Sequence, residues 1–236
     1  MPLMGSAAML MTFDIDADAI AEHDDWHTLE HLPERRSIPG FLRGTRWTAS
    51  GGGQRYFVMY EVETLDVLGS PAYLERLNTP TPWTARMMPH YRGMTRGLCR
   101  VTRSFGSGLG HAAMLVRFAP RPDAADTLRD WLVGTALPAL AAQPGLGNAH
   151  LFESGLKPAM TREQSIRGAD AGVDWAVLVT GYRAEAVDAL AASGLDATTL
   201  AAHGAGPSLH GHYRLHYALV HREIAPAGTS TSAVKR

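Results

Sequence analysis

A single order of predicted elements occurs twice along this chain, and the repeat constrains the fold more than any other feature. Each copy has a strand, a long helix, a Pro-Gly break, two more strands, a second helix and a last strand. The breaks, at 39–40 and 144–145, lie about 105 residues apart. The copies share this order rather than high sequence identity. The order β-α-β-β-α-β in each copy predicts a ferredoxin-like unit of the α+β class.

The repeat also predicts how the chain is divided. We expect a first repeat at 1–106, a second repeat at 111–224 and a loose polar tail at 225–236. The strands expected in the two repeats cover residues 7–15, 41–49, 54–62 and 97–105, then 112–119, 146–153, 173–182 and 209–220. The helices expected cover residues 16–36, 65–77, 123–143 and 184–192.

Each predicted unit has a four-stranded antiparallel sheet with both helices on one face. The other face needs cover, and the sheet of the second unit supplies it when the two sheets pack or curl toward each other. We therefore expect a barrel-like architecture whose interior is lined by alternate strand residues. This interior is where we expect the chemistry.

Composition excludes several classes of function. The 236 residues are 45% hydrophobic and 19% charged, which is typical of a globular protein. The formal net charge of −1 gives no electrostatic reason to expect nucleic acid or an anionic membrane surface. No apolar run approaches the ~20 residues that cross a bilayer, and residues 1–11 indicate a strand rather than a signal peptide. The partner expected is a small molecule or another protein.

Cys99 is the only cysteine, so the chain has no intrachain disulfide and no cysteine-rich zinc site. A lone cysteine fits a reducing compartment. We therefore expect a cytoplasmic protein.

The first long helix carries the densest group of chemical side chains. His23, His27, Glu30 and His31 are separated by three, four, seven and eight residues, which places them on one helical face. A neutral imidazole can remove a proton next to a carbonyl, because its ordinary pKa lies near working pH. We predict His27 or His31 as the base and Glu30 as its orienting carboxylate. The alternative is a solvated helix face without a catalytic role.

This helix also resembles a known superfamily. Trp26, His31 and Leu32-Pro33, followed about eight residues after the histidine by Pro39-Gly40, resemble the dimeric α/β-barrel proteins, particularly their EthD-like branch. The motif occurs only in the first repeat. The resemblance implies a pocket between the sheet and helix one, and His31 matches the family's histidine, whereas His27 is an addition. The superfamily includes cofactor-free monooxygenases, muconolactone isomerases, polyketide cyclases and haem enzymes, so it does not name a reaction.

A zinc alternative arises from the same helix. The segment from His27 to His31 matches the H-x-x-E-H pattern of metalloproteases in which both histidines bind zinc and the glutamate activates water. That family has a different fold, and no further ligand can be assigned here. We predict no metal.

The last predicted strand is rich in histidine. Period-two alternation puts His212, Arg214 and His216 on one face and apolar residues, including Tyr213, on the other. If the polar face looks into the barrel, it lines a pocket for an anionic or oxygen-rich ligand; otherwise it is an exposed edge. Two histidines four residues apart on a strand are ~13 Å apart and cannot share one metal ion unaided.

Aromatic and guanidinium side chains in the first repeat suit an aromatic carboxylate. The candidates for substrate contact are Trp26, Arg46, Tyr60, Trp83 and Arg86. The segment at 157–172 is longer and more charged than its counterpart at 51–53, so we consider both a lid and a plain surface insertion.

These features predict an enzyme that acts on an aromatic or unsaturated carbonyl or carboxylate compound by histidine-mediated proton transfer. An isomerase, cyclase or lyase without an obligatory cofactor fits best, with a single site equipped by the first repeat. A non-catalytic binding or assembly protein is one alternative, in which the polar residues of helix one lie on the surface. A haem- or oxygen-using oxidoreductase is another, because haem is not excluded. Homo-oligomers are left open.

Overall fold

The predicted repeat corresponds to two four-stranded antiparallel sheets in the computed structural model, which describes residues 3–157 and 160–220. The strands of the first half are β1 (Ala7–Ile15), β2 (Phe41–Gly51), β3 (Tyr56–Val62) and β4 (Tyr91–Gly106). The strands of the second half are β5 (Ala112–Phe118), β6 (Leu146–Leu156), β7 (Ala171–Gly172), β8 (Trp175–Gly181) and β9 (Leu209–Val220). Their orders, β4-β1-β3-β2 and β9-β5-β8-β6, are those of two ferredoxin-like units.

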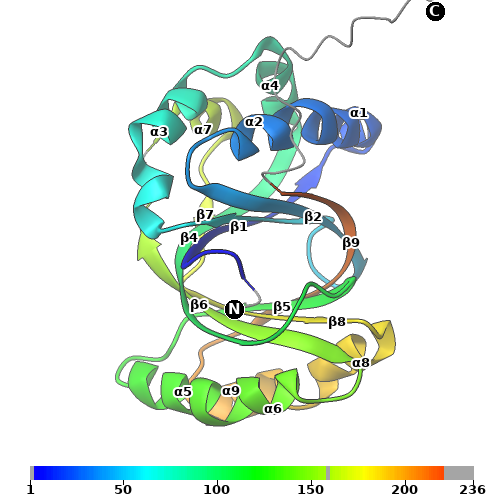
Figure 1. Cartoon of the computed structure of the whole chain (residues 1–236), viewed down its shortest axis with the longest axis vertical. Helices are drawn as coiled ribbons and strands as arrows, with labels where there is room; N and C mark the ends of the chain where they lie inside the picture. Colours follow the sequence, from blue (N-terminus) through cyan, green and yellow to red (C-terminus); the bar gives the residue numbers. More distant parts are fainter. Residues whose placement is uncertain (1–2, 158–159, 221–236) are drawn as a thin grey trace, which may run out of the picture.

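The two sheets close into one eight-stranded antiparallel barrel (Figure 1). Strand β2 pairs with β9, and β4 pairs with β6, so each half contributes both of its edge strands to a seam. Two-residue β7 adds to β4 in parallel. Pairing between the halves satisfies the backbone groups that an isolated four-stranded sheet would expose at its edges. The predicted α+β barrel architecture is confirmed.

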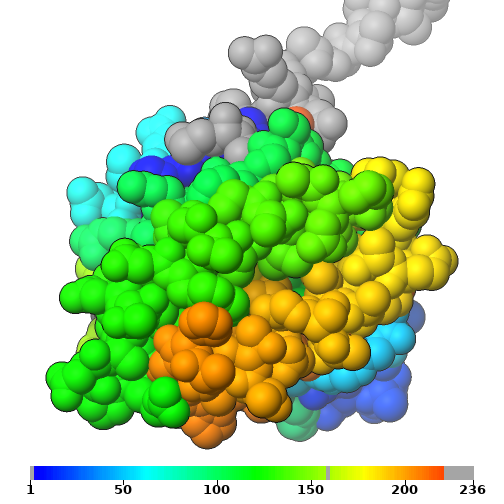
Figure 2. All heavy atoms as spheres, turned by 90° about the horizontal axis from the view of Figure 1, so that it is seen from below, coloured from blue at the N-terminus to red at the C-terminus, as the bar shows by residue number. Residues whose placement is uncertain are grey.

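Helices cover the barrel in two layers, one for each half (Figure 1). The first layer contains η1 (Ala17–Ala19), α1 (Ile20–Trp26), η2 (His27–His31), α2 (Leu32–Arg36), η3 (Leu65–Gly69), α3 (Pro71–Asn78), α4 (Pro82–Met87) and η4 (Met88–His90). The second half contributes α5 (Ala125–Trp131), η5 (Leu132–Ala136), α6 (Leu137–Ala141), α7 (Arg162–Arg167), α8 (Ala184–Asp188), η6 (Ala189–Ala192) and α9 (Ala197–Ala202). Seen from below, the second half forms most of the surface (Figure 2).

One helix of the second half lies in the helix layer of the first half. Helix α7, which follows β6, lies beside α3 in the first layer (Figure 1). The first-half cavity described below therefore has a wall from the second half. No helix among the described residues is long and apolar enough to cross a membrane.

Most predicted elements agree with the structure, and the exceptions are short. The sequence did not predict α4, α7 or α9, each of only six residues, because one or two turns give no readable apolar period. Side-chain caps begin them: Thr81 accepts a hydrogen bond from the Thr84 amide, and Thr161 and Asp196 act in the same way. The predicted tail at 225–236 lies outside the described residues.

Both Pro-Gly breaks have the same backbone geometry. Gly40 has a φ of 87° and Gly145 a φ of 98°, in the left-handed region that favours glycine. A Cβ at Gly40 would lie 2.5 Å from a Val67 methyl carbon, and one at Gly145 would lie 2.6 Å from the Ala186 Cβ. Glycine is therefore required for conformation and for space where helix one turns into the second strand of each half.

The barrel interior corrects one expectation. Apolar side chains from both halves fill it, including Leu3, Leu10, Trp47, Phe57, Leu115, Phe152, Leu178 and Tyr213. The polar pocket expected inside the barrel is therefore not found among the described residues. A small cavity lies on the other side of the first sheet, beneath the helix layer.

Candidate functional site

The candidate site is built on a widened turn of helix one. Residues His27–His31 form a π-helical turn between α1 and α2. In an α-helix of 3.6 residues per turn, side chains four apart drift around the axis. The wider turn offsets part of that drift, so His23, His27, His31 and Arg35 form one continuous line, called here the polar row. Turns of this kind frequently mark functional sites.

The second half contains the same helix without the polar side chains. Its π-helical turn, Leu132–Ala136, lies at the same place in the repeat. The positions equivalent to the polar row are Leu128, Leu132, Ala136 and Leu140, which pack in the apolar core of that half. Apolar packing therefore suffices to build this helix in the second half, so the helix does not require polar side chains at these positions.

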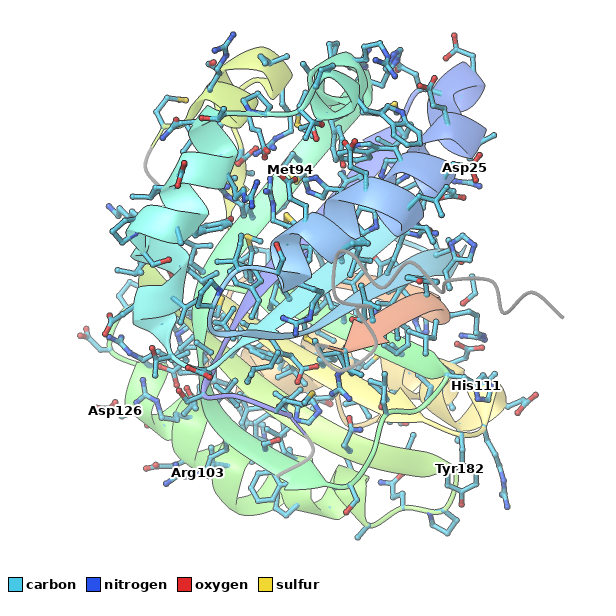
Figure 3. The ribbon with its side chains drawn as sticks, turned by 45° about the horizontal axis from the view of Figure 1, so that its top comes forward. Asp25, Met94, Arg103, His111, Asp126 and Tyr182 are labelled. Atoms are coloured by element: carbon cyan, nitrogen blue, oxygen red, sulfur yellow. The ribbon has the colours of Figure 1, made fainter. Side chains whose placement is uncertain are left out.

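The polar row is buried against a small cavity. His23, His27, His31 and Arg35 are each 7% exposed or less. The cavity, about 20 Å³, lies between the row and the first sheet, and Figure 3 labels Met94 in this region. Its wall consists of Met9, Met11, Phe13, His27, His31, Arg35, Tyr60, Tyr73, Leu77, Met88, Tyr91, Met94, Arg96, Glu163 and Arg167. It is a mainly apolar and aromatic site with a few placed polar groups, as small-molecule sites generally are.

Burial keeps the histidines of the cavity neutral. It lowers the pKa of His27 and of His31 well below the ordinary 6.5, and nearby Arg46 and Arg35 act in the same direction. The Nε2 atom of His27 lies 3.4 Å from the Tyr60 hydroxyl, whose pKa burial raises. Within the described ranges, neither His27 Nδ1 nor His31 Nδ1 has a hydrogen-bond partner. Unprotonated imidazoles in a closed site can accept a proton from a bound compound.

His31 has two close side-chain neighbours on its own helix. The ring centroids of His31 and Trp26 are 4.3 Å apart, and His31 Nδ1 lies 4.0 Å from Glu34 Oε2. Burial raises the pKa of Glu34. Glu30 does not have the predicted orienting role, because its carboxylate accepts hydrogen bonds from the Trp26 indole at 3.2 Å and from the Thr81 hydroxyl at 2.6 Å. The carboxylate nearest His31 is that of Glu34, one helical turn further on.

Helix α7 covers the cavity with two ion-pair clusters. Glu163 forms a very short ion pair with Arg35 of the polar row. Asp170 pairs with Arg96 at 3.3 Å and with Arg167 at 2.8 Å, and its side chain is 3% exposed. The segment at 157–172, considered above as a lid or a surface insertion, thus contributes cavity-lining side chains. Residues 158 and 159 lie outside the described residues.

Three predicted substrate contacts lie away from the cavity. Trp83 and Arg86 both contact Glu22 at the surface, at 3.0 and 3.9 Å. Arg46 is buried but binds the back of helix one through the Asp24 carbonyl, at 3.0 Å, and its Nε lies 3.2 Å from His216 Nδ1. Arg46 therefore anchors the helix to β2. Tyr60, by contrast, lines the cavity, and Trp26 packs against His31 without lining it.

The polar face of the last strand points outward. His212 and Arg214 contact Asp188 of α8 at 3.2 and 2.7 Å. Tyr213, on the opposite face, fills the barrel interior. The sequence left both directions open, and the closed barrel takes Tyr213 and Leu215 into its core. The predicted alternation ends at a register shift in the pairing with β2, because Tyr217 and Leu219 pack in the core beneath the first helix layer. His216 is exposed and does not line the cavity.

Several site residues were missed from the sequence. Arg35 continues the four-residue spacing of the histidines, so the spacing could have identified it. Tyr91 and Arg96 lie at the start of β4, ahead of the predicted strand, and Glu163 and Arg167 come from the unpredicted α7. No local pattern connects these last four residues to the helix, because only the barrel topology brings them together.

The cavity does not fit a haem. Its volume of about 20 Å³ has room for about one water molecule, and the side chains around it fill the remaining space. A permanently bound porphyrin needs a cavity of its own size in the folded protein. A substrate needs such a cavity only while it is bound.

The residues do not fit the zinc alternative either. The Glu30 carboxylate, which would activate water in that motif, accepts hydrogen bonds from Trp26 and Thr81 instead. Across the described ranges, the one group of three metal-ligand side chains is Asp16, Asp18 and His90. Arg92 already pairs there with Asp16 at 2.6 Å.

Solved structures share the fold of this chain. No protein-family model and no curated protein matches the sequence. An anthrone oxidase-like protein superposes with a TM-score of 0.68 at 10% identity, over 94% of this chain and 95% of that one. A provisionally assigned monooxygenase from Fusobacterium nucleatum subsp. nucleatum gives 0.60 at 8%, over 92% and 96%. A chlorite dismutase from Candidatus Nitrospira defluvii gives 0.51 at 17%, over 89% and 91%. The chain therefore has the ferredoxin-like fold of the dimeric α/β-barrel proteins, with both ferredoxin-like units in one polypeptide.

Proposed function

We propose that this chain is an enzyme that removes a proton from a carbon activated by the carbonyl group of a small aromatic or unsaturated compound. The observation that carries this proposal is the buried polar row, whose histidines are neutral and which lies beside a small cavity, where the second half has leucine and alanine. A row placed only for packing would not retain three imidazoles and a guanidinium at the cost of their hydration. Perturbed, buried titratable groups that line a cavity are typical of functional sites.

His31 is the base in this proposal. Its Nε2 takes the proton, and the C–H electron pair stays on the substrate as an enolate. Glu34 lies behind Nδ1 and stabilises the imidazolium that forms, and its 4.0 Å separation shortens when substrate is bound. The cationic side chains of Arg35 and Arg96 line the same cavity and stabilise the enolate oxygen. His27 is held by Tyr60 on the adjacent turn.

The apolar wall indicates the class of substrate. Methionine, phenylalanine and tyrosine side chains surround the polar groups and suit a flat aromatic compound. Because the closed cavity is smaller than any such compound, substrate enters when α7 moves and the flexible methionines repack. The alternative of a non-catalytic protein expected the polar residues of helix one on the surface, and their burial argues against it.

Oxidation of the same enolate is a second candidate. Its support is the fold shared with an anthrone oxidase-like protein and a provisionally assigned monooxygenase. In that reaction, molecular oxygen adds to the carbanion that His31 generates, whereas an isomerase or cyclase would return the proton or close a ring. Both candidates require the same first step.

Finer assignments belong to the proposal as well. We place the chain near the EthD-like branch as a product of tandem duplication, supported by Trp26 and Leu32-Pro33 in one half and Trp131 and Leu137-Pro138 at the matching positions of the other. We also propose that the two repeats are separate domains, that the protein is cytoplasmic and that it forms homo-oligomers.

Deuterium exchange tests the shared first step. Anthrone and related aromatic ketones are incubated with the protein in deuterated buffer without oxygen, and label at the activated carbon is followed by NMR. We expect wild-type protein to accelerate labelling and His31→Gln to lose at least about 100-fold of that acceleration. The control is His203→Gln, which removes a histidine stacked on Trp131 at 3.9 Å in the other half. Equal labelling by wild type and His31→Gln contradicts the proposal, and oxygen uptake in air separates the two candidates.

A further inference from the structure

A proton taken from a substrate in the small cavity must also leave it. Helix α7 forms one wall of the cavity, and the cavity volume of about 20 Å³ holds about one water molecule. We propose that Tyr91, His23 and Asp24 form a proton relay between this cavity and solvent. The role of the relay in turnover depends on the proposed function, whereas its existence can be tested without substrate.

The inner end of the relay is a tyrosine in the cavity wall. Tyr91 is 6% exposed, and its hydroxyl lies 3.4 Å from His23 Nε2. The His23 ring is fully buried, with ring centroids 5.6 Å from Phe13, 4.6 Å from Tyr56 and 5.8 Å from Trp26. These aromatic neighbours exclude water, so His23 exchanges protons only through its two hydrogen-bonding contacts.

The outer end of the relay is a carboxylate that reaches solvent. His23 Nδ1 lies 3.4 Å from Asp24 Oδ1, and the Asp24 side chain is 26% exposed. The Tyr56 hydroxyl donates to the same oxygen at 2.8 Å, and Arg46 Nε lies 3.7 Å from it. Burial alone raises the pKa of Asp24, but the contacts with His23 and Tyr56 lower it overall, so the carboxylate is ionised and ready to accept a proton.

The relay moves a proton from His31 to solvent in a series of balanced transfers. The proton on His31 Nε2 passes through the cavity water to the Tyr91 oxygen, while the Tyr91 hydroxyl proton moves to His23 Nε2. The proton on His23 Nδ1 moves to Asp24, which releases it to bulk water. This passage releases one proton and leaves His23 with its remaining proton on Nε2. The reverse passage carries a solvent proton inward and restores the first tautomer, so the two passages together exchange a substrate proton for a solvent proton.

The neighbouring histidine offers no such route. His27 Nε2 contacts the Tyr60 hydroxyl at 3.4 Å, but no hydrogen bond to His27 Nδ1 is found in the part of the chain that the structure describes. A proton that reached His27 would have no acceptor on the far side of the ring. Of His23 and His27, only His23 therefore has a hydrogen-bonding contact on each ring nitrogen.

Hydrogen exchange at the His23 ring tests the relay directly. The full chain is labelled with ¹⁵N-histidine, and the exchange rate of the His23 ring N–H with solvent is measured by NMR. We expect Asp24→Asn, a substitution of nearly equal shape, to slow this exchange at least about tenfold, because an amide does not accept the proton. The control, Tyr56→Phe, removes a different hydrogen bond to the same Asp24 oxygen and keeps exchange close to the wild-type rate. Equal rates in wild type and Asp24→Asn overturn the relay.

A second measurement connects the relay with turnover. In the ketone assay, Asp24→Asn should slow label uptake by about the factor measured at His23, because His31 must exchange the abstracted proton for a solvent deuteron through the relay. Label uptake at the wild-type rate overturns the relay's catalytic role. Absence of any first turnover in wild-type protein instead overturns the proposed function, and the exchange result at His23 stands independently.

Discussion

At the scale of single residues, the polar row costs the protein stability. His27 and His31 are held neutral by burial, and their Nδ1 atoms have no hydrogen-bond partner among the described residues. An unsatisfied buried polar group costs about 1–3 kcal/mol. Leucine and alanine occupy the equivalent positions of the second half without this cost. Stability given up at a cavity wall is typical of a functional site.

The neutral histidines should make stability depend on pH. Because the folded-state pKa of His27 is depressed, only the unfolded chain takes up a proton as pH falls below about 6.5. Stability is therefore complete above this pH and declines below it, by up to about 1.4 kcal/mol per pH unit for each such histidine. We predict that His27→Leu removes one histidine's share of the decline, as measured by urea unfolding at pH 7.5 and 5.5.

The control for this prediction is a histidine outside the row. His203→Gln should leave the decline between pH 7.5 and 5.5 close to that of wild type, since no such burial surrounds the His203 ring. An unchanged decline in His27→Leu would show that His27 titrates in the folded protein as it does in the unfolded chain.

At the scale of elements, the π-helical turn aligns the site. Deleting Leu29, which is 70% exposed, should convert the turn to regular α-helix and rotate His31 and Arg35 away from His27. We predict at least a tenfold loss of ketone labelling, on the order expected for a misplaced base. Deleting Gly134, the matching residue of the second half, is the control and should preserve labelling. Equal losses in the two deletions would show that the turn contributes only to folding.

The sequence predicted the positions of strands and helices better than it predicted which face of each strand meets the core. Strands and long helices were readable because apolar alternation and helical periodicity extend over enough residues. The outward direction of His212 and Arg214 was not readable, because alternation defines two faces without saying which one meets the core. Helix α7 was too short to show a period, and its place over the cavity depends on contacts with a half that is remote in sequence.

At the scale of the whole molecule, the two halves depend on each other. Their strands share two seams and one apolar interior, and α7 of the second half covers the cavity of the first. The sequence predicted a single, asymmetric site on the first half. This stays a prediction, and its support is that the polar row has apolar counterparts in the second half. The contribution of the second half was predicted through the last strand, whereas the structure provides it through α7.

A substitution at Asp170 tests whether ion pairs hold α7 of the second half against the first half. Removing its charge leaves Arg96 and Arg167 without their shared carboxylate, and breaking a buried ion pair costs roughly 3–5 kcal/mol. We predict that Asp170→Asn speeds amide hydrogen exchange in α7 at least about tenfold, since local opening becomes easier. Asp188→Asn, which breaks an exposed pair with Arg214, should leave α7 unchanged. Unchanged exchange in Asp170→Asn would show that these ion pairs do not hold α7 closed.

The protonation state of His31 is the most direct test of the central claim, that a neutral imidazole lies ready as a base in the closed cavity. Ring ¹⁵N chemical shifts of histidine-labelled protein report both the charge and the tautomer. At pH 6 we predict a neutral His31 that carries its proton on Nδ1, toward Glu34, and leaves Nε2 free to accept one. A protonated His31 at that pH, or a proton on Nε2, would contradict the proposed chemistry.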